Sequence, residues 1–297
     1  VTVDYDGNGC DPTTSNIVQI NVEPDPFSDD ILNDTTVCQT VSPASSAAIL
    51  EVTNVQGGIP PFNYNYQWWQ ATPVLQQVGS NSTTYQPPTD IVGTYTYYCV
   101  ITNDPTSTDC EYITNTHTLT VEAAPTVLVP IQDATICEGG TVPDLYVNPT
   151  GPGTITYEWN LVGGLSNPVG TSSTYTVPTN VAGTYEYYCI VSFSSGGCPD
   201  VTSSNITITI VLDPSALIPT TPADICDGGV IANPLSVNVS GGTGTISYSW
   251  DEIGGSSNPV GTNPTYDPGI LSPVGIYEYQ VTVDYDGNGC DPTTSNI

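Results

Sequence analysis

The sequence predicts an all-β protein built from tandem modules. Segments such as 185–191 and 206–210 alternate in polarity and are rich in β-branched and aromatic residues, and glycine and proline interrupt such segments at short intervals. No segment shows the apolar period of a capped α-helix. The first seventeen residues, 1–17, are identical to the last seventeen, 281–297. This identity indicates a sequence period of 280 residues, which favours an extended structural repeat over an enzyme.

A shorter repeat lies within this period. Each third of the chain carries a leading cysteine, then a Tyr-x-Trp motif, then a Gly-x-Tyr-x-Tyr motif. The leading cysteines are Cys38, Cys137 and Cys226, at spacings of 99 and 89 residues. One period therefore holds three modules of roughly 90 to 100 residues, a common domain size.

Short proline-bearing segments at 22–26, 121–125 and 211–214 predict the module boundaries. Linkers of this composition favour extended, semi-rigid spacing. We expect the last hairpin of a preceding module at residues 1–22, with the last strand of the third module cut short. The three predicted modules are residues 23–122, 123–212 and 213–297.

The strand pattern within each module resembles the immunoglobulin-like β-sandwich. About seven strands, a tryptophan on a middle strand and Tyr-x-Cys on a late strand are the features of that fold. The resemblance implies three tandem immunoglobulin-like modules in an extended array. It also implies a core formed by the recurrent aromatic residues, in which the tyrosines occupy the place of a tyrosine corner. These predicted core residues are Trp68, Trp159, Trp250, Tyr97, Tyr187 and Tyr279.

The nine cysteines indicate disulfide bonds and an oxidising compartment. The third module has Val281 where the others have Cys99 and Cys189, so only Cys226 and Cys290 remain there. The repeat then predicts three disulfides, and Cys99 and Cys189 stay buried free thiols while Cys10 pairs upstream. The predicted pairs are Cys38–Cys110, Cys137–Cys198 and Cys226–Cys290. The rival scheme pairs Cys38 with Cys99 and Cys137 with Cys189.

The charge composition excludes several functions. The chain has no lysine or arginine, 30 acidic residues, one histidine and a net charge of −30. No cation is present to neutralise phosphate, which excludes nucleic acid and anionic membrane surfaces as partners. No apolar run is long enough for a transmembrane helix. One histidine, His117, provides too little material for a Ser-His-Asp triad or a histidine-rich zinc site, so we expect no enzyme activity and no obligatory cofactor.

Three weaker features have alternative interpretations. Two copies of one acidic loop resemble an oxygen-rich calcium site, although Asp-Gly and Asn-Gly also favour a plain hairpin turn. The loop residues are Asp4, Asp6 and Asn8, and again Asp284, Asp286 and Asn288. His117 is interpreted as a strand position at which the sister modules have Ile206 and Val18. Trp69, Tyr98 and Tyr188 face outward in the predicted strands and could stack on sugars.

Four motifs of the second module carry a family resemblance. They are Ile-Cys-Glu-Gly-Gly at 136–140, Tyr-Glu-Trp at 157–159, Gly-Thr-Tyr-Glu-Tyr-Tyr-Cys at 183–189 and Gly-Gly-Cys at 196–198. Together they resemble the immunoglobulin-like and PKD-like repeats of giant cell-surface and secreted proteins of Bacteroidota. The first module departs most, because Cys38-Gln-Thr-Val replaces Cys-x-Gly-Gly and an extra tryptophan, Trp69, is present.

That resemblance implies an extracellular stalk or filament of a bacterial surface adhesin. Its implied partners are copies of itself and a surface glycan or cell-surface protein. Two alternatives remain open: a spacer or carbohydrate-contacting module of a secreted polysaccharide-degrading enzyme, and a short subunit that polymerises by itself.

Overall fold

The computed structural model describes residues 1–4, 6–7, 9–29, 31, 34–40, 45–103, 110–130 and 132–297. Within these residues the regular elements are β-strands, apart from one 3-10 turn at Ser46–Ala48. This part of the chain contains no helix with the length and apolar character needed to cross a membrane. The chain divides into two compact units, residues 1–124 with 195–197, and residues 125–194 with 198–297.

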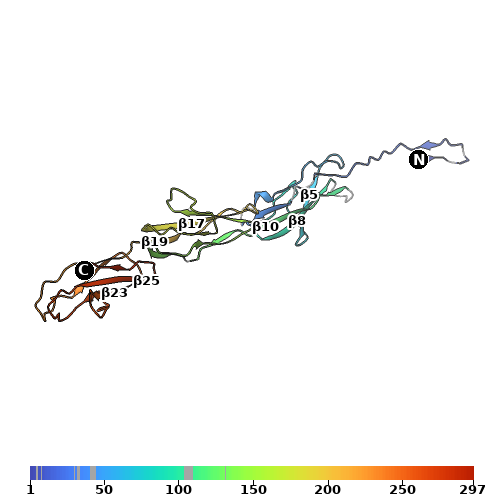
Figure 1. Cartoon of the computed structure of the whole chain (residues 1–297). Helices are drawn as coiled ribbons and strands as arrows, with labels where there is room; N and C mark the ends of the chain where they lie inside the picture. Colours follow the sequence, from blue (N-terminus) through green and yellow to red (C-terminus); the bar gives the residue numbers. More distant parts are fainter. Residues whose placement is uncertain are drawn as a thin grey trace. The chain divides into compact units, whose positions relative to one another are not determined.

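The first unit contains one complete sandwich (Figure 1). Its large sheet has the strand order β3-β10-β8-β5-β6, with β9 beside β8, and a small sheet of β4 and β7 packs against it. Strand β10 runs parallel to β3 and antiparallel to β8. A separate hairpin of β1 and β2 precedes the sandwich. The strands are β1 (Thr2–Val3), β2 (Thr13–Thr14), β3 (Thr35–Cys38), β4 (Leu50–Glu51), β5 (Asn65–Thr72), β6 (Gln76–Val78), β7 (Thr84–Tyr85), β8 (Gly93–Thr102), β9 (Glu111–Ile113) and β10 (His117–Glu122).

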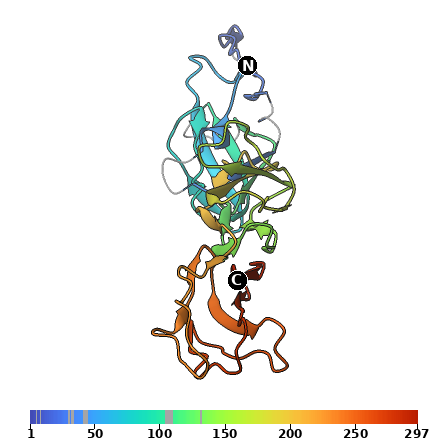
Figure 2. The same cartoon turned by 60° about the vertical axis from the view of Figure 1, so that its left-hand side comes forward.

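The second unit contains two further sandwiches, shown from a second direction in Figure 2. The second sandwich repeats the first, with the order β12-β19-β17-β15, β18 beside β17, and the small sheets β13-β16 and β11-β14. Its strands are β11 (Thr126–Leu128), β12 (Ala134–Cys137), β13 (Leu145–Tyr146), β14 (Asn148–Thr150), β15 (Ile155–Leu161), β16 (Thr174–Tyr175), β17 (Gly183–Phe193), β18 (Val201–Thr202) and β19 (Ile206–Val211).

The third sandwich has a sheet of β23, β25 and β26 and the small sheets β20-β22 and β21-β24. Its strands are β20 (Ser215–Leu217), β21 (Leu235–Ser236), β22 (Asn238–Ser240), β23 (Thr245–Glu252), β24 (Thr265–Tyr266), β25 (Tyr279–Asp286) and β26 (Thr293–Thr294).

Alternation of apolar and polar residues sets the two faces of each sheet. In β19, Ile206, Ile208 and Ile210 are buried and the threonines between them are half-buried. Strand β10 shows the same pattern. Because successive side chains of a strand point to opposite faces, this period of two puts one row into the core. The chain therefore consists of tandem immunoglobulin-like β-sandwich modules, and the predicted fold class is confirmed.

The third sandwich differs from the other two along one edge. Strand β8 begins at Gly93 and β17 at Gly183, but β25 begins only at Tyr279. The segment 223–226, which corresponds to β12, forms no strand. In the second sandwich, β19 lies between β12 and β17 and pairs with both. The counterpart of β19 in the third sandwich would follow Ile297, so the described residues do not include the strand with which 223–226 and 275–279 would pair.

Candidate functional site

A stack of one tryptophan and two tyrosines recurs in each sandwich. In the second, the ring centroid of Trp159 lies 6.3 Å from that of Tyr175, which lies 5.4 Å from that of Tyr187. Trp159 Nε1 donates a hydrogen bond to Ser172 O at 3.0 Å. Burial raises the pKa of Tyr187 to about 12 because the phenolate would be desolvated. The other stacks are Trp68–Tyr85–Tyr97 and Trp250–Tyr266–Tyr279.

The corner hydrogen bond belongs to a different tyrosine from the one that the sequence indicated. Tyr185 Oη donates to Val181 O at 3.1 Å, because Tyr185 lies at the start of β17, beside the preceding loop. Tyr187 lies two residues further along, in the centre of the core. Tyr97, at the corresponding place in the first sandwich, has a buried hydroxyl without a hydrogen-bond partner among the described residues. The same corner bond joins Tyr95 to Ile91 and Tyr277 to Pro273.

Removing the corner hydroxyl should have a measurable cost. We expect Tyr185→Phe to lower the free energy of unfolding of the second sandwich by about 1 kcal/mol, a typical net value for one hydrogen bond. Urea denaturation followed by circular dichroism gives this difference. Tyr188→Phe is the matched control, because Tyr188 points to the opposite face of β17. Equal losses in the two variants would contradict the assigned role of Tyr185.

The disulfide pairing differs from the prediction. Cys137 is bonded to Cys290, so the predicted pairs Cys137–Cys198 and Cys226–Cys290 are wrong. Cys38 and Cys198 are each disulfide-bonded, whereas Cys110 is a free thiol, which also overturns Cys38–Cys110. Cys226 is a free, exposed thiol.

Strand direction explains why pairing within one module fails. Strand β12 runs parallel to β19, which places Cys137 beside Val211, at the end where β19 leaves the sandwich. Strand β17 starts at that same end with Gly183, and Cys198 follows its far end at Phe193. Ten residues of strand span about 33 Å. Disulfides need Cα atoms within about 7 Å of each other, so the two cysteines of one module lie too far apart.

The Cys137–Cys290 bond instead joins the second sandwich to the loop after β25 of the third. Beside it, Cys137 N donates to Asn288 O at 3.0 Å. Gly289 has a φ of +67°, and a Cβ added there would lie 2.6 Å from Gly140 Cα, so this close approach requires glycine. The disulfide, the backbone hydrogen bond and the glycine contact together form a module junction.

The first unit contains a related contact. Gly196 also has a positive φ, +68°, and a Cβ added there would meet Glu122 Oε2 at 2.8 Å and Cys38 N at 3.5 Å. A glycine near the late cysteine of one repeat thus lies against the leading-cysteine strand, as Gly289 lies against Gly140.

Cys99 and Cys189 are buried free thiols at the centre of β8 and β17. The backbone N of Cys189 donates to Ser203 Oγ at 2.8 Å, and that of Cys99 to Thr114 Oγ1 at 2.9 Å. Burial raises the pKa of the Cys99 thiol to about 12 and that of Cys189 to about 11. Because the thiolate is the reactive form, both groups are protected from alkylation and exchange.

Thiol labelling checks this assignment. At pH 8, iodoacetamide should modify Cys110 and Cys226 of the folded chain, while Cys99 and Cys189 react at least about 100-fold more slowly. Because burial favours the protonated thiol, burial of Cys189 stabilises the fold fully at a pH below the ordinary thiol pKa. That stabilisation is lost as the pH rises from about 9 toward 11. Labelling of Cys189 should increase over the same interval. Equal labelling rates at pH 8, measured by mass spectrometry, would contradict the burial.

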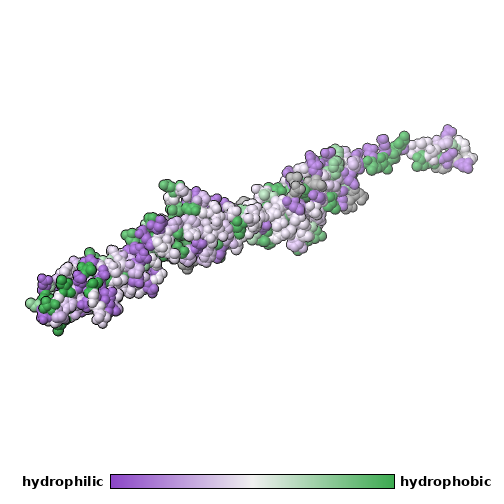
Figure 3. Space-filling view, viewed as in Figure 1, coloured by the Kyte–Doolittle hydropathy of each residue, from purple (hydrophilic) through white to green (hydrophobic). Residues whose placement is uncertain are grey.

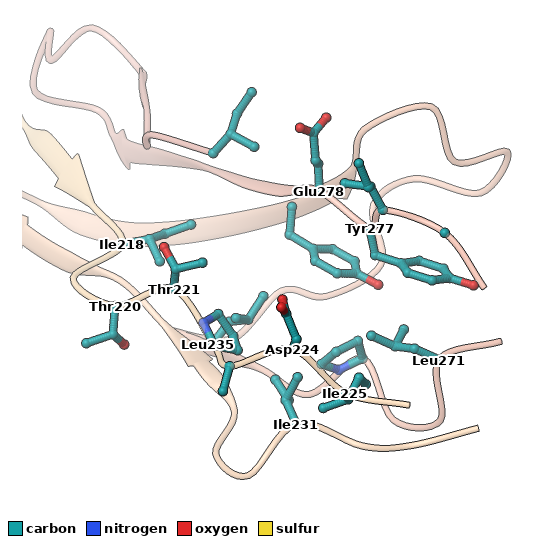
Figure 4. Close-up of a pocket in the computed structure, with 17 residues that line it drawn as sticks. Ile218, Thr220, Thr221, Asp224, Ile225, Ile231, Leu235, Leu271, Tyr277 and Glu278 are labelled. Atoms are coloured by element: carbon teal, nitrogen blue, oxygen red, sulfur yellow. The ribbon is translucent and has the colours of Figure 1, made fainter. Parts of the chain in front are cut away.

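The open edge of the third sandwich is a groove of ≈ 540 Å³. One side consists of Asp224 and Ile225 and the other of Tyr277 and Glu278, with Ile218 between them (Figure 4). Ile225 is 39 % exposed, whereas Ile136, its counterpart in the second sandwich, is 5 % exposed. The groove is therefore part of a core that the described chain leaves uncovered.

The remaining candidate residues have structural surroundings. His117 is buried on β10 and pairs with Tyr97, which agrees with a strand position. Trp69 is half-buried and stacks on Tyr98, with centroids 6.5 Å apart. Tyr188 is half-buried too.

The predicted calcium loops lie in two places. Asp4 and Asp6 belong to the loop of the N-terminal hairpin, and Asn8 lies outside the described residues. Asp284 and Asp286 lie on β25, and Asn288 follows in the loop of the junction. Among the residues that the structure describes, no three His, Cys, Asp or Glu side chains gather as a metal site. A calcium site in this loop stays a prediction.

The fold and the junction define a tandem immunoglobulin-like repeat region. No family model and no curated protein matches the chain. Among solved structures, it is similar to the I-band fragment I67–I69 of titin, at 12 % identity over 91 % of this chain and 96 % of that one, with a TM-score of 0.47. It is also similar to the three N-terminal domains of the outer capsid protein Hoc of bacteriophage RB49, at 13 % identity over 91 % of this chain and 99 % of that one, with a TM-score of 0.44. A third similar structure is that of immunoglobulin domains 1–5 of Sidekick-1, at 16 % identity over 93 % of this chain and 59 % of that one, with a TM-score of 0.39.

Proposed function

We propose that this chain is a non-enzymatic structural repeat region that forms an extracellular stalk or filament of a bacterial surface adhesin. The observation that carries the proposal is the junction, in which Cys137–Cys290 joins successive sandwiches of a sequence with a 280-residue period. A covalent bond between neighbouring modules transmits tension from one to the next, which a stalk requires. Disulfides are typical of oxidising compartments outside the cytosol. The lack of lysine and arginine leaves trypsin no cleavage site, which suits exposure to proteases.

Immunogold electron microscopy of the producing cells, with antibodies against this chain, tests the proposal. Gold particles along filaments that project from the cell surface are the expected result. Gold confined to secreted material on insoluble polysaccharide, together with glycan-cleaving activity of the purified protein, would replace the stalk by an enzyme spacer.

A second form of the same function is a subunit that polymerises by itself. The reduced and denatured mass of the purified filament protein separates the two forms. A mass close to that of one repeat unit assigns the filament to separate subunits. A mass of hundreds of kilodaltons assigns it to one long repetitive chain.

A further inference from the structure

The groove of the third sandwich has the position of one missing strand. In the second sandwich, β19 pairs in parallel with Ala134–Cys137 and antiparallel with Gly183–Tyr187. In the third sandwich, residues 223–225 and 275–279 of the corresponding segments line the groove. A strand placed between them would complete the sheet as β19 does in the second sandwich.

The structure also fixes where that strand would enter. Ser203 N donates to Cys189 O at 2.9 Å, three residues before β19 begins. Ser295 N donates to Val281 O at the same distance of 2.9 Å. The third sandwich is therefore organised like the second up to its last residues, and the direction of the missing strand is already set.

A segment with the residue pattern of the missing strand lies exposed elsewhere in the chain, although it forms no strand there. In the segment 18–22, which follows the N-terminal hairpin, Val18 is 77 %, Ile20 82 % and Val22 92 % exposed. Figure 3 shows apolar surface along the N-terminal segment beyond the hairpin. Their counterparts in the second sandwich are all buried, namely Ile206, Ile208 and Ile210. An exposed segment whose apolar residues alternate with polar ones has the pattern of a strand that one face of a sheet would bury.

The sequence period connects the strand with the groove. Residues 1–17 are identical to 281–297, so the period places the sequence Val18–Val22 directly after Ile297. The segment carries no charge, which suits a groove flanked by the carboxylates of Asp224 and Glu278. The exposed segment therefore has the length, pattern and place in the sequence period that the groove requires.

We propose that the groove of the third sandwich binds the strand Val18–Val22 of a second copy of this repeat unit. The strand pairs as β19 does in the second sandwich, so that Ile20 lies opposite Tyr277 on one side and Ala223 on the other. Backbone hydrogen bonds hold the strand, and Ile20 and Val22 cover Leu235 and Ile225. The inference rests on the proposed function and names its unit-to-unit junction. The register is the same whether the second copy is joined to Ile297 or is a separate molecule.

Self-association of the 297-residue chain tests the separate-molecule case. Analytical ultracentrifugation should show oligomers that grow with concentration, and Ile20→Asp should leave the chain monomeric. Ile17→Asp is the matched control, because Ile17 is equally apolar and exposed but precedes the strand. Association of the Ile20→Asp chain at the level of the parent chain would overturn the proposal.

A chain extended after Ile297 by Val-Gln-Ile-Asn-Val tests the joined case. The amides of 275–278 should exchange with deuterium at least about tenfold more slowly than in the parent chain, because they gain strand partners. The extended chain should also be monomeric, since its groove is filled. An extended chain with aspartate in place of its added isoleucine is the control, and unchanged exchange in the all-apolar extension would overturn the proposal.

A failure of the strand pairing can be distinguished from a failure of the proposed function. Strand binding by a protein that forms no surface filament would contradict the stalk and leave the strand pairing intact. Surface filaments whose assembly is unaffected by Ile20→Asp would support the stalk and contradict the strand pairing.

A second inference comes from the cysteines. The leading Cys137 is bonded to the late Cys290 of the sandwich that follows. Cys226 is the leading cysteine of the third sandwich, and its segment Cys226-Asp-Gly-Gly repeats Cys137-Glu-Gly-Gly. Gly229 N donates to Cys226 O at 2.8 Å, as Gly140 N donates to Cys137 O at 3.1 Å. The same half-junction is thus present at Cys226, whose thiol is free and exposed.

We infer that Cys226 forms a disulfide with Cys110 of the following repeat unit. Cys110 is a free thiol between β8 and β9 of the first sandwich, in the place that Cys290 has after β25. Spacing supports the pair. Cys137 and Cys290 are separated by 153 residues, and Cys110 of the following unit, one 280-residue period further along, lies a similar 164 residues beyond Cys226. The bond forms by exchange with an external disulfide, such as that of an oxidising thiol–disulfide protein. The two thiols lose two protons and two electrons, and the external disulfide becomes two thiols.

Disulfide mapping of the native protein tests this bond. Pepsin digestion without reduction, followed by mass spectrometry, should yield a peptide with Cys226 linked to a peptide with Cys110. For separate subunits, a non-reducing gel should show a ladder of cross-linked copies that Cys226→Ser abolishes. Cys189→Val is the control, because the third sandwich has valine at that position. A Cys226 that is found alkylated, or bonded to another cysteine, would overturn the inference.

Discussion

Replacing Trp159 by alanine is expected to lower the free energy of unfolding of the second sandwich by about 3–5 kcal/mol, the range for large aromatic residues in cores. Trp159 has no exposed surface and contacts the ring of Tyr175. Its backbone N donates to Gly170 O at 2.8 Å, and its indole N–H donates to Ser172 O. Alanine would leave a large cavity and free the carbonyl of Ser172.

The measurement is pulse proteolysis with chymotrypsin in increasing urea, with cleavage inside residues 145–211 quantified by mass spectrometry. Trp69→Ala is the control in the first sandwich, because Trp69 is half-buried and stacks on Tyr98 at the surface of the sheet rather than in the core. Its cost should stay below about 1.5 kcal/mol, the upper value for one aromatic pair. Equal costs for the two variants would mean that the stack does not carry the stability of the sandwich.

The recurrent core could be predicted from the sequence because its signal is local. The Tyr-x-Trp motif marks a middle strand, and a period of two places Trp159 and Cys189 on the inner face. Val281 in the position of Cys189 indicated that this position needs an apolar side chain rather than a disulfide. These inferences require only the alternation along one strand.

The corner bond depends on a position that alternation does not resolve. Tyr185 and Tyr187 lie on the same face of β17, so a period of two cannot tell them apart. Their roles are decided by depth along the strand, since only Tyr185 lies near the carbonyl of Val181. The sequence signal for the corner bond was the position of Tyr185, four residues after Val181 in the loop that precedes β17.

The disulfide pairs and the groove depend on the parallel pairing of β12 with β19, which joins segments about 70 residues apart. Once that pairing is known, Cys137 must lie at the end of the sandwich from which the chain continues. The repeat of 1–17 at 281–297 already indicated that a segment like 18–22 follows Ile297 in the sequence period. What the sequence lacked was evidence that the strand after this repeat lies between two others.

Pulling on the chain from its ends should show that the Cys137–Cys290 bond shields the residues between its cysteines from tension. The force passes through the bond, so the 153-residue separation adds no length when the second and third sandwiches unfold. Cleavage of the bond should add about 500 Å of contour length at about 3.3–3.6 Å per residue. In the chain-entropy model, a loop of this size also stabilises the fold by about 5 kcal/mol.

A variant with Cys38→Ser and Cys198→Ser isolates this bond for single-molecule force spectroscopy. Unfolded with and without a reductant, it should differ in length by the stated amount, and further substitution of Cys290→Ser should remove the difference. A contour length that is unaffected by reductant would show that tension does not pass through the junction. The expected gain would make the junction a limit on extension, because a module that unfolds under load can then lengthen only outside its cross-linked segment. That property follows from the bond between Cys137 of the second sandwich and Cys290 of the third, since a bond within one module leaves the linkers between modules to carry the load alone.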